Sequence, residues 1–145
     1  MAREFDRLVR LVAKLRSPTG CPWDRAQDHR SLIRYLKEET REVEQALKSG
    51  KWHDIEDELG DLLLQILLHA QIKAEEGRFD IEDVARSQYL KLRRRHPHVY
   101  GGPRFKTPKD VLRNWDTIKV AERKRRAADV LKRNGARKSR RATRR

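Results

Sequence analysis

The chain has 145 residues, of which 40% are charged, and a formal net charge of +14 at pH 7. This length predicts one domain with a hydrophobic core, and no apolar run approaches the ~20 residues that a membrane span needs. The single cysteine, Cys21, excludes an internal disulfide and a cysteine-based zinc site. The first residues lack the apolar stretch of a signal peptide, so we expect a cytoplasmic protein without a membrane partner.

The positive charge is concentrated at the C-terminal end. Residues 122–145 contain 12 Lys and Arg against two acidic residues, whereas residues 1–121 contain 24 basic and 20 acidic residues. We therefore predict a nearly balanced domain over residues 1–121, and a basic helix extension with a disordered tail over residues 122–145. The tail would either bind nucleic acid nonspecifically through counterion release or have no partner.

Helical periodicity dominates the first half of the chain, and strand signals are weak throughout. A first helix is predicted over about residues 4–15, followed by a break at residues 17–22, where two prolines and a glycine cannot continue it. A second helix is predicted over about residues 30–48, with Asp28 as its N-cap and Ser49-Gly50 as its stop signal.

The third predicted helix, over about residues 54–76, is the most apolar. Its middle, residues 62–68, is apolar almost all round, so we expect burial against a second subunit. A fourth helix is predicted from Asp80 to about Arg95, and a fifth from about residue 108 to 132, before the stop signal Asn134-Gly135. The fold prediction is an all-α bundle of four to five helices that forms a homodimer.

Five carboxylates form two clusters inside the second and third predicted helices. They are Glu38, Glu39 and Glu42, then Glu58 and Asp61. Glu39 interrupts an apolar stripe, while Glu58 and Asp61, three residues apart, share one helix face. Like charges at this spacing repel each other, and a divalent cation would offset that repulsion.

A short loop joins these two helices, which should therefore lie antiparallel and bring the two clusters together. Carboxylates without a thiolate or histidine favour Mg²⁺, or alternatively Mn²⁺, over zinc or copper. Protein-bound Mg²⁺ commonly also contacts phosphate oxygens, so we expect a phosphorylated substrate. The alternative is a solvated acidic helix face. An EF-hand is excluded because Leu59 stands where that loop needs glycine, and a ferritin-like di-iron site is excluded because neither cluster has the required histidine.

Several short motifs occur together in a fixed order. They are Cys21-Pro22-Trp23-Asp24, the Glu-Glu-x-x-Glu and Glu-x-x-Asp clusters, Glu76-Gly77-Arg78-Phe79-Asp80, and Arg94-Arg95-His96-Pro97-His98-Val99-Tyr100-Gly101. Over roughly residues 5–120 the chain resembles the MazG family of all-α nucleoside triphosphate pyrophosphohydrolases. The resemblance implies a dimeric helical bundle that binds Mg²⁺ and hydrolyses a nucleoside triphosphate to the monophosphate and pyrophosphate.

The resemblance also implies roles for the acidic residues. It makes Glu39, Glu42, Glu58 and Asp61 the expected metal ligands. Two roles stay open for Glu38, which would orient or deprotonate the attacking water or bind a second metal ion. Water would attack the α-phosphorus, as the products of the family require.

Basic and aromatic residues further along the chain correspond to the substrate contacts of the family. Lys91, Arg95 and Lys119 would bind the phosphates, and Trp115 would stack on the base. Without the resemblance, Lys91 and Arg95 fit equally well as solvated helix surface, and Trp115 as a core residue.

Two other functions stay open at this point. The basic end of the chain is also typical of a nucleic-acid-binding helical protein whose acidic clusters are structural. A regulator that binds nucleotides without hydrolysing them would use the same residues. Release of pyrophosphate from a nucleoside triphosphate in the presence of Mg²⁺ separates the enzyme from both alternatives.

Overall fold

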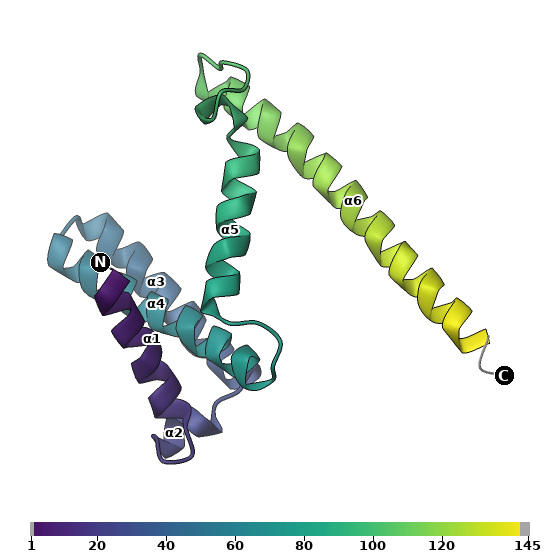
Figure 1. The fold of residues 1–145 in the computed structure, drawn as a ribbon. Helices are drawn as coiled ribbons and strands as arrows, with labels where there is room; N and C mark the ends of the chain where they lie inside the picture. The colour runs from purple at the N-terminus through teal and green to yellow at the C-terminus, as the bar shows by residue number, and fades with distance from the viewer. Residues whose placement is uncertain (1, 143–145) are drawn as a thin grey trace. The chain divides into compact units, whose positions relative to one another are not determined.

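The computed structural model describes the backbone of residues 2–142 and the side chains of residues 3–125 and 127. All regular structure in this part of the chain is helical, which confirms the all-α prediction (Figure 1). The helices are α1 (Ala2–Arg16), α2 (Pro22–Ala26), α3 (His29–Ser49), α4 (Trp52–Glu75), α5 (Ile81–Arg95), the 3-10 helix η1 (Pro97–Val99) and α6 (Pro108–Ala142). None of the helices described here is both long enough and apolar enough to cross a membrane.

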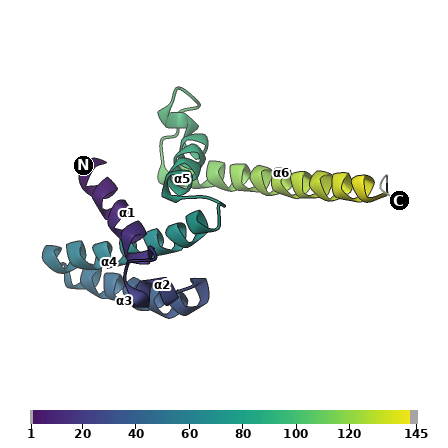
Figure 2. The same ribbon diagram turned by 60° about the horizontal axis from the view of Figure 1, so that its bottom comes forward.

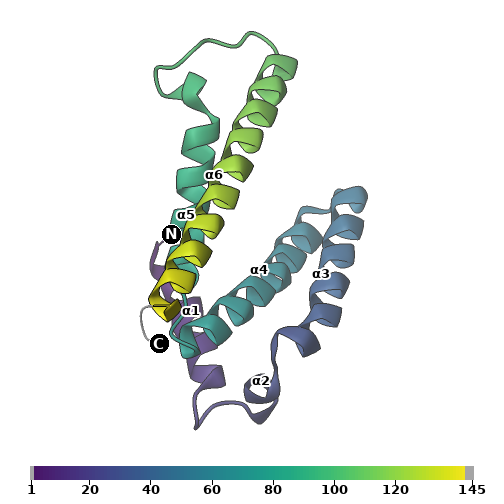
Figure 3. The same cartoon turned by 90° about the vertical axis from the view of Figure 1, so that its right-hand side faces the viewer.

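The chain divides into two compact units, Met1–Arg86 and Ser87–Arg145. The first unit is built around the helical hairpin α3–α4, whose two helices lie side by side (Figures 1 and 3). Gly50 ends α3 in the left-handed conformation, at φ 69°, and this lets the chain reverse its direction before α4 begins at Trp52. The short loop therefore produces the antiparallel pair that the sequence predicts.

The N-terminal end of α3 is fixed by a capping box. The Asp28 carboxylate accepts a hydrogen bond from the Ser31 backbone N–H at 2.7 Å, and the Ser31 hydroxyl accepts one from the Asp28 N–H at 3.0 Å. Two backbone donors that the helix itself leaves unpaired are satisfied in this way. The predicted N-cap at Asp28 is confirmed.

The core of the first unit is small and lies where α1 crosses α4 and α4 packs on α3 (Figure 2). Its buried members are Val12, Leu32, Leu67, Leu68 and Ile72. They come from α1, α3 and α4, so the apolar stripes of three helices meet at one place.

The Arg16 side chain links the end of α1 to α4 through an ion pair. Its Nε and Nη2 atoms each lie 2.9 Å from one carboxylate oxygen of Glu75, and its Nη1 also donates to the backbone carbonyl of Gln27 at 3.1 Å. The Arg16 side chain is only 6% exposed. This planar, two-pronged contact is the geometry in which an arginine–carboxylate pair is strongest.

The apolar middle of α4 is only partly covered within this chain. Leu67 and Leu68 are buried, but Leu59 and Ile66 remain 49% and 43% exposed. The described residues of the chain therefore leave apolar surface on this helix uncovered. The homodimer that was expected to cover it stays a prediction.

The second unit begins within α5 and contains η1 and α6. Thr107 caps α6 through a hydrogen bond that its hydroxyl accepts from the Asp110 N–H at 3.3 Å, and Pro108 occupies the first helical position. The helix continues through Asn134-Gly135 to Ala142, so the expected stop signal does not end it. A single interior glycine costs a helix only about 1 kcal/mol, and the flanking Ala, Arg and Lys residues are strong helix formers. The division into a domain over 1–121 and an extension over 122–145 stays a prediction, and residues 143–145 lie outside the described part.

Candidate active site

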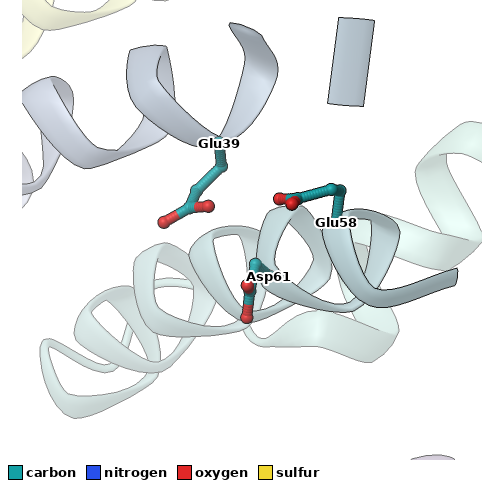
Figure 4. Close-up of side chains that lie close together, drawn as sticks. All are labelled: Glu39, Glu58 and Asp61. Carbon is teal, nitrogen blue, oxygen red and sulfur yellow. The ribbon is translucent and has the colours of Figure 1, made fainter. Parts of the chain in front are cut away.

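Three of the predicted metal ligands converge between α3 and α4. Glu39 projects from α3 toward α4, which carries Glu58 and Asp61 three residues apart on one face (Figure 4). Each residue contributes one carboxylate oxygen, and these three oxygens all lie within 4.8 Å of one another. Glu39 and Glu58 are partly buried and Asp61 is exposed. We call these three residues the acidic cluster.

The electrostatics of the acidic cluster are unfavourable without a cation. Burial raises the pKa of the Glu39 carboxyl above its ordinary value, and the charges of Asp61 and Glu42 raise it further. Burial also raises the pKa of Glu58, again with added repulsion from Glu42 and Asp61. Within the described part of the chain, no lysine or arginine forms an ion pair with the acidic cluster.

Glu42 lies beside the acidic cluster without joining it. It is partly buried on α3, and it lines a hollow of about 290 Å³ together with Asp54 and Glu58. Among the neighbouring charges, that of Glu42 raises the pKa of Glu58 the most. The fourth predicted ligand, Glu42, therefore lies near the other three residues. Its carboxylate oxygens are not among those that lie within 4.8 Å of one another.

Glu38 occupies the exposed position next to Glu39 on α3. Its charge contributes to the raised pKa of Glu39, so it lies within electrostatic reach of the acidic cluster. It is not one of the three residues whose oxygens converge. The role expected for Glu38 stays a prediction.

A histidine pair lies further along the same helical hairpin. The Nδ1 atoms of His29 and His69 are 2.7 Å apart, and the rings stack with an interplanar angle of 8°. Burial lowers the pKa of His69, with a further contribution from His29. The contact with His29 was missed, because it depends on the register of the two helices.

The predicted phosphate-binding residues gather in the second unit. Lys91, Arg95 and Lys119 line a hollow of about 520 Å³. Three further basic residues, Arg94, Arg123 and Arg125, line it as well and were not predicted from the sequence. Helical spacing offered a signal for one of them, because Arg123 follows Lys119 by four residues on α6.

One acidic residue stands among these basic side chains. The carboxylate of Glu122 accepts hydrogen bonds from Arg95 Nη2 at 2.6 Å and from Arg94 Nε at 2.8 Å. These two contacts lower the pKa of Glu122 to about 2. The carboxylate therefore occupies a position in which an anion is strongly stabilised.

Trp115 is partly buried against the start of the second unit. Its ring meets that of His96 edge to face, with centroids 4.9 Å apart, and the Lys119 ammonium lies 5.9 Å from the indole centroid. The structure therefore brings Trp115 and Lys119 together, as their four-residue spacing predicts. The contact with His96 also fits the alternative reading of Trp115 as a packed residue.

Residues 27–100 match the family model of the MazG nucleotide pyrophosphohydrolase domain. The chain belongs to the MazG family. The matched segment, about half of the chain, contains all five predicted acidic residues as well as Lys91 and Arg95, while Trp115 and Lys119 lie beyond it. The family resemblance drawn from the short motifs is confirmed.

Individual relatives support the same assignment. The chain is 47% identical over 119 residues to a Thermotoga maritima protein named nucleoside triphosphate pyrophosphohydrolase/pyrophosphatase MazG, covering 82% of this chain and 45% of that protein. It is 42% identical over 125 residues to the Escherichia coli K12 nucleoside triphosphate pyrophosphohydrolase, covering 86% of this chain and 48% of the relative. The chain thus spans less than half the length of these two MazG relatives.

The fold is also similar to a solved structure. A crystal structure of a MazG-related protein from Thermotoga maritima matches with a TM-score of 0.63 and 25% sequence identity, covering 79% of this chain and 97% of that one. The all-helical architecture therefore has an experimental counterpart within the family.

Proposed function

We propose that this protein is a Mg²⁺-dependent nucleoside triphosphate pyrophosphohydrolase, which converts an NTP or dNTP to the monophosphate and pyrophosphate. The observation that carries the proposal is the acidic cluster, in which three carboxylates from two helices converge without a basic partner among the described residues. The printed names of the Thermotoga and Escherichia relatives support the same activity. The match to the family model covers the segment that supplies the cluster.

The residues of the acidic cluster suit a hard divalent cation. All of their donor atoms are carboxylate oxygens, the ligand type of Mg²⁺ and Mn²⁺. The raised pKa values of Glu39 and Glu58 mean that their ionised forms are destabilised in the cation-free chain. Bound Mg²⁺ would supply charge neutralisation at the phosphate oxygens and would make a coordinated water more acidic.

Each acidic residue then has its own task. Glu39, Glu58 and Asp61 hold the cation, and Glu42, one turn beyond Glu39 on α3, completes the carboxylate set. Glu38 is exposed next to Glu39 on α3, and its carboxylate orients or deprotonates the attacking water or binds a second metal ion.

The second unit supplies groups for the anionic substrate. Lys91, Arg95 and Lys119 bind phosphate oxygens and stabilise the negative charge of the leaving pyrophosphate. Arg95 is engaged by Glu122 in the structure, so a phosphate must compete with this carboxylate for the guanidinium. Trp115, with the Lys119 ammonium at its ring, offers a surface for the base.

A panel of eight common NTPs and dNTPs, incubated with the protein and Mg²⁺, tests the proposal. We expect pyrophosphate rather than orthophosphate from at least one of them, and no product when EDTA replaces Mg²⁺. Repeating the assay with Mn²⁺ establishes whether that ion substitutes. A panel without any pyrophosphate would remove the proposal and would favour a nucleotide-binding regulator.

Nucleic-acid binding is a second candidate function because the C-terminal end carries 12 Lys and Arg between residues 122 and 145. A chain that ends at Arg133 separates this function from the first. We expect hydrolysis to survive the truncation and any salt-sensitive binding of nucleic acid to be lost. Loss of hydrolysis would instead place the removed residues in the active site.

We also propose that the protein acts as a homodimer, because Leu59 and Ile66 leave apolar surface on α4 exposed in a single chain. Sedimentation equilibrium measures the state directly. A mass of one chain at all concentrations would contradict the dimer.

A further inference from the structure

Gln65 on α4 is a buried polar residue in an apolar stretch. Its side chain is 5% exposed, and it is the one polar residue among the described side chains that is buried to this degree. Its Oε1 atom has no hydrogen-bond partner in the described part of the chain. An unpaired amide oxygen inside a protein is destabilising, whereas a leucine in the same place would gain from burial.

The position of Gln65 links it to the acidic cluster. It follows Asp61 by four residues and Glu58 by seven, so the three side chains share one face of α4. A helical side chain leans toward the N-terminal end of its own helix, so that of Gln65 leans toward the turn that carries Asp61. The same preference directs the amide of Gln65 toward the turn of α4 that carries Asp61.

Glu39, on the opposite helix α3, lies near the same part of α4. Glu39 lies beside Asp61, and His29 lies beside His69, so α3 and α4 run antiparallel with a fixed register. Glu39 leans toward the N-terminal end of α3, which is the direction of Gln65 on α4. By this general preference, the side chains of Glu39 and Gln65 are directed toward each other from α3 and α4.

The missing partner of Gln65 must be a hydrogen-bond donor, because the unpaired atom is an oxygen. The neighbouring Glu39 and Asp61 carboxylates accept hydrogen bonds when ionised and cannot fill this role. A water molecule can donate to Gln65 Oε1 and to a carboxylate at the same time.

We propose that Gln65 is a positioning residue of the metal centre, whose Oε1 accepts a hydrogen bond from a water molecule in the hydration shell of the cation held by the acidic cluster. The inference rests on the proposed function, since it requires that the cluster binds a cation. Gln65 acts through the water, by fixing its orientation between α3 and α4. Groups that orient the surroundings of a bound metal in this way typically change its affinity about 10- to 100-fold when they are removed.

Mn²⁺ binding, measured by isothermal titration calorimetry without nucleotide, tests the role of Gln65. The variants are Gln65→Met, which keeps the length of the side chain, and Gln65→Leu; Gln71→Met is the matched control, because Gln71 lies on the same helix and donates a hydrogen bond to Glu75 instead. We expect the dissociation constant for Mn²⁺ to rise about 10-fold or more in both Gln65 variants. We expect it to stay within about twofold of the wild-type value in the control.

Thermal unfolding of the metal-free proteins separates positioning from a structural role. We expect the metal-free Gln65 variants to melt at or above the wild-type temperature, because the unpaired oxygen is gone. Unchanged Mn²⁺ affinity in both variants, or unfolding of both without metal, would overturn the inference. If the wild-type protein itself bound no Mn²⁺, the metal centre of the proposed function would fall, and the inference about Gln65 with it.

Discussion

Glu39 on α3 and Asp61 on α4 hold their carboxylates together across the helical hairpin, with Glu58 as the third member of the group. Two residues 22 positions apart in the sequence are neighbours because α3 and α4 are joined by a tight reversal at Gly50. Burial of Glu39 and the repulsion from Asp61 raise the Glu39 pKa, so the pair is destabilised unless a cation is present. This arrangement is the structural basis of the metal-dependent activity that we propose.

Glu39→Gln tests the acidic cluster. The substitution keeps the size of the side chain and removes one charge, so we expect the rate of pyrophosphate release to fall at least about 100-fold. The metal-free variant should melt at a higher temperature than the wild type because one repulsive charge is gone. Steady-state assays and thermal unfolding measure the two effects.

Glu44→Gln is the matched control for this variant. Glu44 lies on the same helix but is exposed and pairs with Lys48, away from the cluster. Its replacement should leave the rate within about twofold of the wild-type value and change stability little, because exposed pairs contribute little. A Glu39 variant that behaved like this control would contradict a catalytic role for the cluster.

Arg16→Met tests the link between α1 and α4. The variant loses the two-pronged contact with Glu75 and the hydrogen bond to the Gln27 carbonyl, so we expect the free energy of unfolding to fall by about 2–3 kcal/mol. Arg7→Met is the control, since Arg7 forms an exposed pair with Glu4 on the same helix. Chemical denaturation measures both, and equal small effects would show that the Arg16 contact adds little.

The His29–His69 pair predicts how stability depends on pH. Since the pKa of His69 is lowered in the folded protein from its ordinary value of 6.5, the unfolded chain takes up a proton first as the pH falls. The free energy of unfolding should therefore decrease below about pH 6.5 and keep decreasing until His69 itself is protonated in the folded state. Thermal unfolding between pH 7.5 and 5 follows this change.

His69→Leu removes the titrating group, so its melting temperature should depend less on pH over that range. His53→Leu is the control, because His53 is an exposed histidine on the same helix and lies outside the His29–His69 contact. Identical pH dependence in the wild type and the His69 variant would refute the assignment.

Glu122→Gln tests competition at the basic hollow of the second unit. The substitution removes a carboxylate that engages Arg94 and Arg95, so we expect pyrophosphate to bind about 3- to 10-fold more tightly. Glu82→Gln is the control for net charge, because Glu82 is an exposed acidic residue on α5 that does not contact these arginines. Weaker binding in the Glu122 variant would show that the carboxylate aligns the arginines instead of competing with phosphate.

Local signals in the sequence predicted much of the first unit. The Asp28 cap, the reversal at Gly50 and the three-residue spacing of Glu58 and Asp61 were sufficient to place the acidic cluster between two antiparallel helices. Each of these features acts over a few residues, which is why the sequence displays it directly. The contact between His29 and His69 was not predicted. It lies ten residues from Glu39 along α3 and depends on how α3 and α4 are aligned over that length, which no local sequence pattern determines.

Features that depend on packing or on a balance of small terms were less predictable. The role proposed for Gln65 depends on its burial, and a glutamine within an apolar helix carries no local sequence signal for that burial. Arg94 and Arg123 were overlooked because basic residues are abundant in this half of the chain, and spacing alone does not select among them. The helix α6 passes Gly135 because one unfavourable residue is outweighed by its neighbours.

Hydrolysis of a nucleoside triphosphate in ¹⁸O-labelled water with Mg²⁺, followed by mass spectrometry of both products, tests the central claim most directly. Attack of water on the α-phosphorus predicts one ¹⁸O atom in the nucleoside monophosphate and none in the pyrophosphate, with the signal lost in Glu39→Gln. Release of orthophosphate, label in the pyrophosphate, or full activity in the Glu39 variant would contradict the claim.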